Sequence, residues 1–345
     1  MKYDVLVVGA GPAGATAAYL LARGGARVLM VDTRKEPGVP VQCAEFVPLQ
    51  LRSLFPEFFP PEVTAQKVCN MTHFTPWGEV FSMKSEGFVL HRDRFDGNIV
   101  HLARKAGAEL RMRTRFVGFS EGKALLKDLR SGTCHRIGVG FVVGADGARS
   151  AVAKLSGEAT ERFLPTAQIT LPLREKLADL LIFFRDYIPG GYGWIFPKGS
   201  HANVGVGVDP RYPVRVGEVL DRFVGEVKAL GLVHGSGVRR SGGWIPAEGM
   251  KRPLRGNFML VGDAGGFCHP ITGGGIANAV QTGAMAASAL LEGSPADFAQ
   301  ECEEVFGSSL RRAAQRRIKY MGNWDNLRFI IPRTWIAFEE YWKEE

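Results

Sequence analysis

The chain has 345 residues, of which 46% are hydrophobic and 23% charged, an ordinary composition for a globular protein. Its 43 lysines and arginines exceed its 35 acids by 8, and this excess favours anionic partners such as lipid headgroups, phosphorylated substrates or nucleic acid without choosing among them. No apolar run reaches the roughly 18 residues that cross a bilayer. Five cysteines without a CxxC pair indicate neither a disulfide framework nor a zinc site. We therefore expect a cytoplasmic protein with reduced thiols and no metal site.

The order of the predicted elements indicates an α/β fold. Residues 3–8 are a valine-rich apolar run ending at glycine, which is typical of a parallel strand buried on both faces. A helix over 12–23 and a second buried strand over 27–31 complete the opening βαβ unit of a doubly wound sheet. The sequence after Pro37 is predicted to be loop-like, because seven prolines lie between residues 37 and 76. Further along we predict helices over 92–105, 216–230 and 276–291, strands over 141–144 and 258–261, and a β-rich stretch over 163–208.

A glycine-rich turn follows the first strand and consists of Gly9, Ala10, Gly11, Pro12, Ala13 and Gly14. Glycines at this spacing permit a tight turn and a close approach of the backbone to a pyrophosphate, and the following helix offers its free N–H groups to the phosphates. Asp32 ends the second strand, 18 residues after Gly14, where a carboxylate accepts hydrogen bonds from ribose hydroxyls. A glycine turn beside a surface aspartate is the structural alternative. The pattern predicts a dinucleotide site and does not separate NAD from FAD.

A second segment adds an acidic turn. The strand predicted over 141–144 runs into a turn with Asp146 and Gly147 at its apex. An ordinary Asp-Gly hairpin is the alternative, but such a hairpin would not predict the third segment.

The third segment, residues 261–276, follows the last predicted strand. This strand delivers Asp263, preceded by Gly262, at its carboxyl end, where the carboxylate reaches a ribityl hydroxyl. A triple glycine at 273–275 then precedes a helix of small residues that begins at Ile276, and a helix N-terminus suits the negative charge that develops on a reduced flavin. The second and third segments therefore favour FAD over NAD.

With these segments, the chain resembles the geranylgeranyl reductase family, within the para-hydroxybenzoate hydroxylase-type flavoproteins. Four local matches support the narrower resemblance, at residues 40–45, 91–96, 192–198 and 263–276. The resemblance implies a bound FAD with Val117 near the adenine. The other residues implied at the FAD are Gly9, Gly11, Pro12, Ala13, Gly14, Asp32, Thr33, Cys43, Ala44, Phe46, Arg92, Asp146, Gly147, Gly262, Asp263, Pro270, Gly273, Gly274, Gly275 and Ile276.

The predicted fold is a discontinuous Rossmann-like FAD-binding domain with an inserted β-rich substrate domain and a C-terminal helical segment. Strands of dinucleotide-binding type occur at the start, in the middle and late in the chain, with β-rich sequence between them. The predicted boundaries are 1–65, 88–158 and 250–297 for the FAD-binding domain, 66–87 and 159–249 for the substrate domain, and 298–345 for the C-terminal segment.

Three residues are candidates for chemistry at the flavin, namely Cys43, Tyr192 and His269. In the family, the loop with Cys43 lies against the isoalloxazine, so the thiol is expected to shield or tune the flavin or to donate a proton; a small buried residue is the alternative. His269 is a candidate acid, but a loop histidine bonded to backbone is the preferred interpretation. Tyr192, Trp194 and Phe196 alternate on one strand face. The resemblance implies that they line a cavity for a polyprenyl chain, with sheet core as the alternative.

We predict an FAD-dependent oxidoreductase that reduces C=C bonds of an isoprenoid, geranylgeranyl-type or other hydrophobic substrate by hydride transfer from reduced flavin. One glycine fingerprint is present, so electrons are expected from transiently bound NAD(P)H or from a ferredoxin-like carrier. A flavin-dependent monooxygenase of a small aromatic substrate is the second hypothesis, and a non-catalytic flavin-binding partner protein is the third. The basic residues are scattered and accompany no recognised motif, which argues against a nucleic-acid partner.

The C-terminal segment is basic and aromatic. Residues 311–333 carry seven basic residues and one acid, Asp325, and tryptophan, tyrosine and phenylalanine continue to residue 342. An interfacial helix in peripheral contact with a membrane is one interpretation. The preferred one is a helix whose aromatic side chains dock on the body of the protein and whose arginines are solvated.

Overall fold

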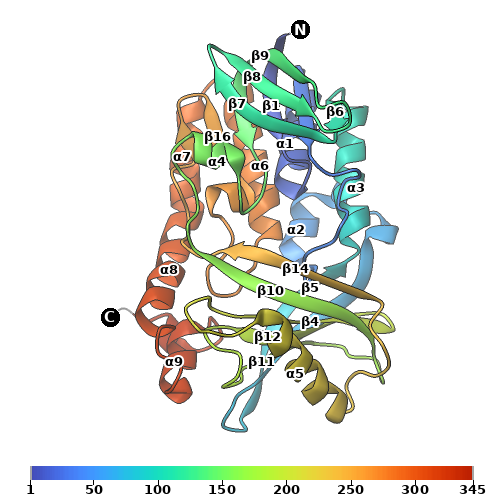
Figure 1. Cartoon of the computed structure of the whole chain (residues 1–345), viewed down its shortest axis with the longest axis vertical. Coiled ribbons are helices and arrows are strands. Elements are labelled where there is room, and N and C mark those ends of the chain that lie inside the picture. The colour runs from blue at the N-terminus through green and yellow to red at the C-terminus, as the bar shows by residue number, and fades with distance from the viewer. Residues whose placement is uncertain (1, 344–345) are drawn as a thin grey trace. The chain divides into compact units, whose positions relative to one another are not determined.

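The computed structural model describes residues 2–343, and the chain forms two compact units, each assembled from separate stretches of sequence (Figure 1). Unit 1 comprises the chain up to Pro40, Asp93–Arg162 and Pro246–Arg312; unit 2 comprises Val41–Arg92, Phe163–Ile245 and the chain from Ala313 onward. Each unit contains one eight-stranded sheet together with helices. The predicted α/β fold class is confirmed.

The sheet of unit 1 has a parallel centre. β1 (Lys2–Val8) lies between β2 (Val28–Asp32) and β9 (Cys134–Gly144), and pairs in parallel with both. Beyond β2 lies β6 (Glu109–Met112), and beyond β9 lie β16 (Phe258–Leu260) and β15 (Leu254–Arg255). An antiparallel ribbon of β7 (Thr114–Ser120) and β8 (Lys123–Asp128) continues from β9. Because β1 is buried along most of its length, its valine-rich sequence suits a central strand.

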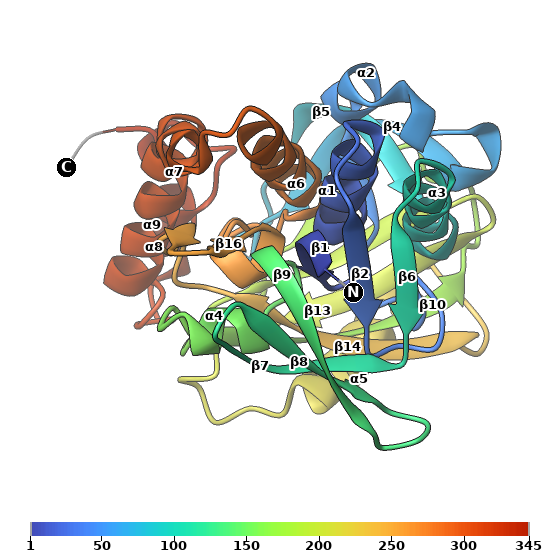
Figure 2. The ribbon, with the colours of Figure 1, turned by 90° about the horizontal axis from the view of Figure 1, so that it is seen from above.

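The helices of unit 1 are α1 (Pro12–Arg23), α3 (Arg92–Lys105), α4 (Ala151–Leu155), α6 (Ile276–Leu291) and α7 (Pro295–Cys302). α1 and α6 lie side by side (Figure 2). A Cβ on Gly283 of α6 would lie 2.2 Å from the carbonyl oxygen of Ala13 in α1, so the helices pack closely because this position has no side chain. This close packing explains the small-residue composition of α6.

The sheet of unit 2 has the order β14-β10-β13-β12-β11-β4-β5-β3. The strands are β3 (Phe46–Pro48), β4 (Thr64–Phe74), β5 (Val80–Leu90), β10 (Phe163–Pro172), β11 (Leu180–Phe183), β12 (Tyr192–Lys198), β13 (His201–Gly207) and β14 (Arg239–Pro246). Helix α5 (Val216–Ala229) packs on one face, where Phe223 meets Phe183 of the sheet at 5.3 Å between ring centroids and joins a cluster with Ile195 and Val204. This packing leaves the opposite face of β12 for other contacts.

The proline-rich stretch after Pro37 is more regular than predicted. It contains β3, helix α2 (Leu49–Leu54) and the two long strands β4 and β5. Pro56 and Pro61 open short 3₁₀ helices, where a missing N–H leaves no bond unmade, so these prolines separate elements without breaking them. Because β3 pairs with β5, residues 41–65 belong to unit 2.

The C-terminal segment continues through α8 (Ser308–Tyr320) and α9 (Leu327–Thr334). Trp324, Trp335 and Tyr341 are buried, as the docking interpretation expects. The expectation of solvated arginines is wrong for two of them. Arg316 donates to the carbonyl oxygens of Arg333 and Lys343, and Arg317 to that of Gly190, so both guanidinium groups tie the segment down within unit 2. Trp342 remains exposed.

Candidate functional site

The glycine turn in unit 1 leaves its backbone open on one side. Gly9 has φ +108°, and a Cβ there would lie 2.2 Å from the carbonyl oxygen of Ala145. A Cβ on Gly14 would lie 1.9 Å from the carbonyl oxygen of Gly9. By contrast, beyond Gly11 itself and its two chain neighbours, no atom of the described residues lies within 4 Å of the Cβ position of Gly11. Two glycines are therefore required by packing, and the third keeps a space at the N-terminus of α1, which suits a pyrophosphate.

Asp32 is fixed against this turn. Its carboxylate accepts the backbone N–H of Ala10 at 2.8 Å and that of Arg34 at 2.8 Å. Thr33, between Asp32 and Arg34, is exposed. The carboxyl end of β2 thus holds a carboxylate beside the glycine turn, in the position required for a ribose contact. The residues present fit a dinucleotide cofactor.

Asp146 has a structural use that the sequence did not reveal. β9 ends at Gly144 and is followed by α4, so the turn is not a hairpin. The Asp146 carboxylate accepts a hydrogen bond from the hydroxyl of Ser150 and from the backbone N–H of Ala151, and thereby caps α4. Burial raises the pKa of Asp146. Gly147 has φ +79°, which glycine tolerates.

The late glycine segment places a carboxylate next to a helix N-terminus. Asp263 lies in a 3₁₀ turn directly after β16, and its Oδ1 is 3.3 Å from the Cβ position of Gly275, the residue before α6. The backbone N–H of Gly262 donates to the hydroxyl of Thr282 in α6, which ties the turn to that helix. The remaining predicted residues of this segment, Pro270, Gly273, Gly274 and Ile276, lead from this turn into α6.

His269 orders the same loop. Its Nδ1 accepts the backbone N–H groups of Ile271 and Thr272, at 3.4 and 3.2 Å. Burial lowers the pKa of His269 to about 4, so the ring is neutral at pH 7. These contacts favour the loop interpretation over the role of an acid.

In unit 2, the face of β12 opposite α5 is an aromatic floor, which we define as Tyr192, Trp194 and Phe196. Trp194 lies opposite Gly205 of β13, and a Cβ on Gly205 would lie 2.2 Å from the indole ring. Glycine at this position therefore lets the indole lie flat on the neighbouring strand. Tyr192 meets Trp335 of the C-terminal segment at 4.8 Å between ring centroids, so the floor ends at that segment.

The segment with Cys43, Ala44 and Glu45 is attached to this sheet. Gln168 of β10 donates to the carbonyl oxygen of Cys43 at 2.8 Å, and Asn203 of β13 donates to that of Ala44 at 3.3 Å. The backbone N–H of Glu45 points to the sulfur of Cys43 at 3.2 Å. Contacts from two neighbouring strands therefore fix the orientation of this turn.

The Glu45 side chain is completely buried and holds the turn through charge. Its Oε2 accepts Lys198 Nζ at 2.7 Å and Asn203 Nδ2 at 2.6 Å, and its Oε1 accepts the backbone N–H of Arg92, the first residue of α3, at 3.0 Å. Arg239 lies 3.8 Å from the same carboxylate. No role was predicted for Glu45, since an acid in an unassigned loop shows nothing of the cations that surround it after folding.

The Cys43 thiol is held in its neutral form. Burial raises its pKa, and the opposing effect of the nearby Arg92 guanidinium does not cancel that rise. A neutral thiol can donate a proton, whereas a nucleophile or a metal ligand requires the thiolate. Phe46, next along the chain, meets Phe196 of the aromatic floor at 6.3 Å between ring centroids.

The predicted site residues are therefore divided between the units. Unit 1 holds the glycine turn, Asp32, Val117, Asp146 and the late glycine segment, whereas unit 2 holds Cys43, Ala44, Phe46, Arg92 and the aromatic floor. Val117, expected near the adenine, is 51% exposed on β7. Within residues 2–343 there is no cluster of three metal-ligating side chains, and none of the helices described there is long and apolar enough to span a membrane.

Comparisons with known proteins match both parts of the chain. The model of the geranylgeranyl reductase catalytic domain matches residues 167–234, which include the aromatic floor. The model of an FAD binding domain matches residues 2–44 and 85–174, which include the glycine turn and Asp146.

Relatives extend over most of the chain. A digeranylgeranylglycerophospholipid reductase of Methanocella arvoryzae is 35% identical over 311 residues, which cover 83% of this chain and 76% of that protein. Digeranylgeranylglycerophospholipid reductase 1 of Methanococcoides burtonii is 33% identical, and the match covers 98% of this chain and 85% of that protein. Solved structures also match. A geranylgeranyl bacteriochlorophyll reductase-like protein of Thermoplasma acidophilum has a TM-score of 0.85 at 26% identity, and the match covers 98% of this chain and 93% of that chain. A flavin-dependent brominase shares the fold, with a TM-score of 0.75 at 17% identity; that match covers 96% of this chain and 90% of the brominase chain.

Proposed function

Because this chain belongs to the geranylgeranyl reductase family of FAD-dependent oxidoreductases, we propose that it reduces carbon–carbon double bonds in the isoprenoid chains of a lipid. The observation that carries this proposal is the aromatic floor of β12, which is attached through Phe46 and Phe196 to the turn that holds Cys43. Trp194 and Phe196 are each 7% exposed and Tyr192 is half-buried, so the floor is a largely enclosed apolar face. Such a face suits a polyprenyl chain, whereas a small polar substrate would gain little from it.

The residues of this chain have separate tasks in the proposed reaction. The glycine turn, Asp32, Asp263 and the N-terminus of α6 hold the FAD, which supplies the hydride when it is bound and reduced. Tyr192 and Trp194 position the alkene and exclude water. One alkene carbon receives the hydride and the other a proton, for which the neutral Cys43 thiol is the proposed donor. Solvent returns the proton to Cys43 after each turnover.

We propose that the electrons come from outside the chain, from NAD(P)H bound transiently or from a ferredoxin-like carrier. The sequence contains one glycine fingerprint, and FAD occupies it in this proposal. Anaerobic stopped-flow reduction by NADH, NADPH or reduced ferredoxin, followed at the flavin absorbance, identifies the donor. Contact with a membrane surface through the C-terminal segment is also a proposal, in which the exposed side chains of Phe329 and Trp342 are the candidate aromatic anchors.

The test of the activity is anaerobic turnover of dithionite-reduced holoenzyme with a digeranylgeranyl phospholipid. We expect products heavier by two hydrogens for each reduced double bond, and a Cys43→Ser variant that still binds FAD but forms product more slowly. Cys69→Ser, at an exposed thiol outside the turn, is the matched control. A hydroxylated product that requires O₂, with no hydrogenated lipid, would overturn the proposal in favour of a monooxygenase.

A further inference from the structure

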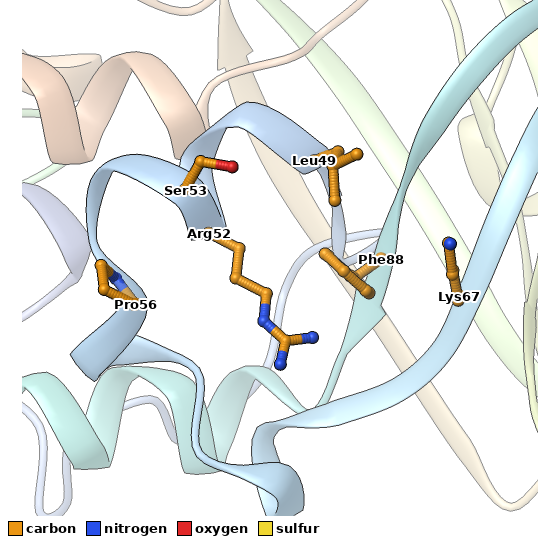
Figure 3. Close-up of a pocket in the computed structure, with 6 residues that line it drawn as sticks. All are labelled: Leu49, Arg52, Ser53, Pro56, Lys67 and Phe88. Carbon is orange, nitrogen blue, oxygen red and sulfur yellow. The ribbon is translucent and has the colours of Figure 1, made fainter.

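A pocket of about 420 Å³ opens on unit 2 between α2 and the strands β4 and β5 (Figure 3). The residues that line it are Leu49, Arg52, Ser53 and Pro56 from α2 and the turn after it, Lys67 from β4 and Phe88 from β5. No acidic side chain is among them. The pocket therefore combines two cations and a hydroxyl with an apolar lining, and the proposed reaction has so far given it no role.

Phe88 organises the two cations. Lys67 and Phe88 are directly opposite each other in the β4–β5 ladder, so their side chains leave the sheet on the same face. The guanidinium carbon of Arg52 lies 5.2 Å from the centroid of the Phe88 ring, which holds the arginine over the same residue. Figure 3 shows Arg52 and Lys67 on opposite sides of Phe88.

The two cations are available for a ligand. Arg52 and Lys67 are exposed, and neither is paired with a carboxylate among the residues that the structure describes. Phe88 is 4% exposed, so the base of the pocket is a buried side chain of the sheet. A site of this kind suits an anion attached to an apolar body, because guanidinium binds phosphate bidentately while the hydrocarbon next to the phosphate contacts the half-buried Leu49.

The pocket is connected by sequence and by pairing to the aromatic floor. α2 begins directly after β3, whose Phe46 meets Phe196 of the floor, and Val47 of β3 pairs with Phe88 in the pocket. All these residues belong to unit 2. Phe46 and Phe88 occupy alternate positions of the β3–β5 ladder, so their side chains leave opposite faces of the sheet, next to its edge strand β3. A lipid whose phosphate is held in the pocket would therefore reach the aromatic floor around this edge.

We propose that this pocket binds the phosphate group of the lipid substrate, an inference that rests on the proposed function for the identity of the lipid. Arg52 and Lys67 would neutralise the phosphate, Ser53 would donate a hydrogen bond, and Leu49 would contact the adjoining hydrocarbon, with Phe88 holding Arg52 in place. The headgroup is thereby selected by residues other than those that handle the alkene.

Binding to the FAD-loaded protein tests the proposal without turnover. The probes are dioctanoyl phosphatidic acid, dioctanoylglycerol as the neutral analogue, and inorganic phosphate, each titrated calorimetrically at fixed ionic strength. We expect the phosphatidic acid to bind at least about tenfold more tightly than either of the other two, because charge-assisted hydrogen bonds and apolar contact act together. If inorganic phosphate binds as tightly as phosphatidic acid, the pocket is a site for free phosphate. If dioctanoylglycerol binds as tightly as phosphatidic acid, the pocket does not recognise phosphate and the proposal is overturned.

The decisive variant is Arg52→Gln/Lys67→Gln. Its matched control is Lys84→Gln/Arg215→Gln, which removes the same charge at side chains that are 77% and 85% exposed outside the pocket. We expect about a tenfold or greater loss of phosphatidic acid affinity in the pocket variant and little change in the control. An equal loss in both would show a general effect of net charge and overturn the proposal. Lys67→Gln alone, which leaves the Arg52–Phe88 contact intact, covers the case in which the double variant unfolds.

Turnover then separates this inference from the proposed function. In the pocket variant, KM for a phosphorylated isoprenoid lipid should rise while kcat stays unchanged, and KM for an unphosphorylated isoprenoid alcohol should not move. If the wild-type protein reduces neither compound, the proposed function fails and the binding result stands by itself. If both KM values rise together, the pocket does not recognise phosphate.

Discussion

The buried carboxylate of Glu45 provides the sharpest test of how the site is held together. The substitution Glu45→Gln removes the negative charge and keeps the size of the side chain. Lys198, whose side chain is 12% exposed, then has no carboxylate at 2.7 Å, and the new amide group meets donors where an acceptor stood. Leaving one member of a buried ion pair without its partner costs about 3–5 kcal/mol. Because Lys198 retains some solvent contact, we expect a loss of about 3 kcal/mol in the free energy of unfolding.

The assay is urea denaturation of the FAD-loaded protein, analysed as a double-mutant cycle. Lys198→Met also leaves the carboxylate without its closest cation, whereas Glu45→Gln/Lys198→Met removes both charges together. We therefore expect the double variant to be more stable than the sum of the single losses implies, with a coupling of about 1–3 kcal/mol. Arg215→Gln, which breaks an exposed pair with Glu218, is the control and should cost less than about 1 kcal/mol. A Glu45→Gln loss no larger than that of the control, or additive single losses, would refute the reasoning.

The remaining predictions concern the glycine turn and a buried histidine. Gly14→Ala should prevent folding of unit 1 or abolish FAD retention, because its Cβ would lie 1.9 Å from the Gly9 carbonyl oxygen, whereas Gly11→Ala should fold and lose FAD affinity, measured by flavin fluorescence. A Gly11→Ala variant with normal FAD affinity would contradict a pyrophosphate at that position. Burial lowers the pKa of His73 from 6.5 to about 4, so the unfolded chain binds a proton more readily than the folded chain. The free energy of unfolding should therefore fall by up to about 3 kcal/mol as the pH drops from 6.5 to 4. His73→Phe, which preserves the ring stacked on Phe81 at 4.6 Å, should flatten this part of the denaturation-midpoint profile, and an unchanged slope would show that His73 is not its source.

The local signals of the first βαβ unit were sufficient to predict it from sequence. The apolar runs of β1 and β2, the glycine spacing and Asp32 are determined by backbone sterics and strand burial within one short stretch, so they can be recognised without tertiary information. The late segment with Asp263 and its triple glycine was recognisable for the same reason. An isolated turn is ambiguous in sequence, because the Asp-Gly pair at Asp146 is compatible with a hairpin and also with the start of a helix that the aspartate caps, as it does here.

Only the tertiary structure decided which residues hold the turn with Cys43, Ala44 and Glu45 in place. Glu45, Lys198 and Asn203 are up to 158 positions apart in sequence, and their charges meet only after the strands of the sheet have paired. The burial of Arg316 and Arg317 also depends on tertiary structure. In the sequence these arginines resemble a solvated helix face, but in the fold they donate hydrogen bonds to carbonyl oxygens of distant segments. Sequence determines patterns that one element can satisfy by itself, whereas long-range pairing of polar groups depends on which elements the fold brings together.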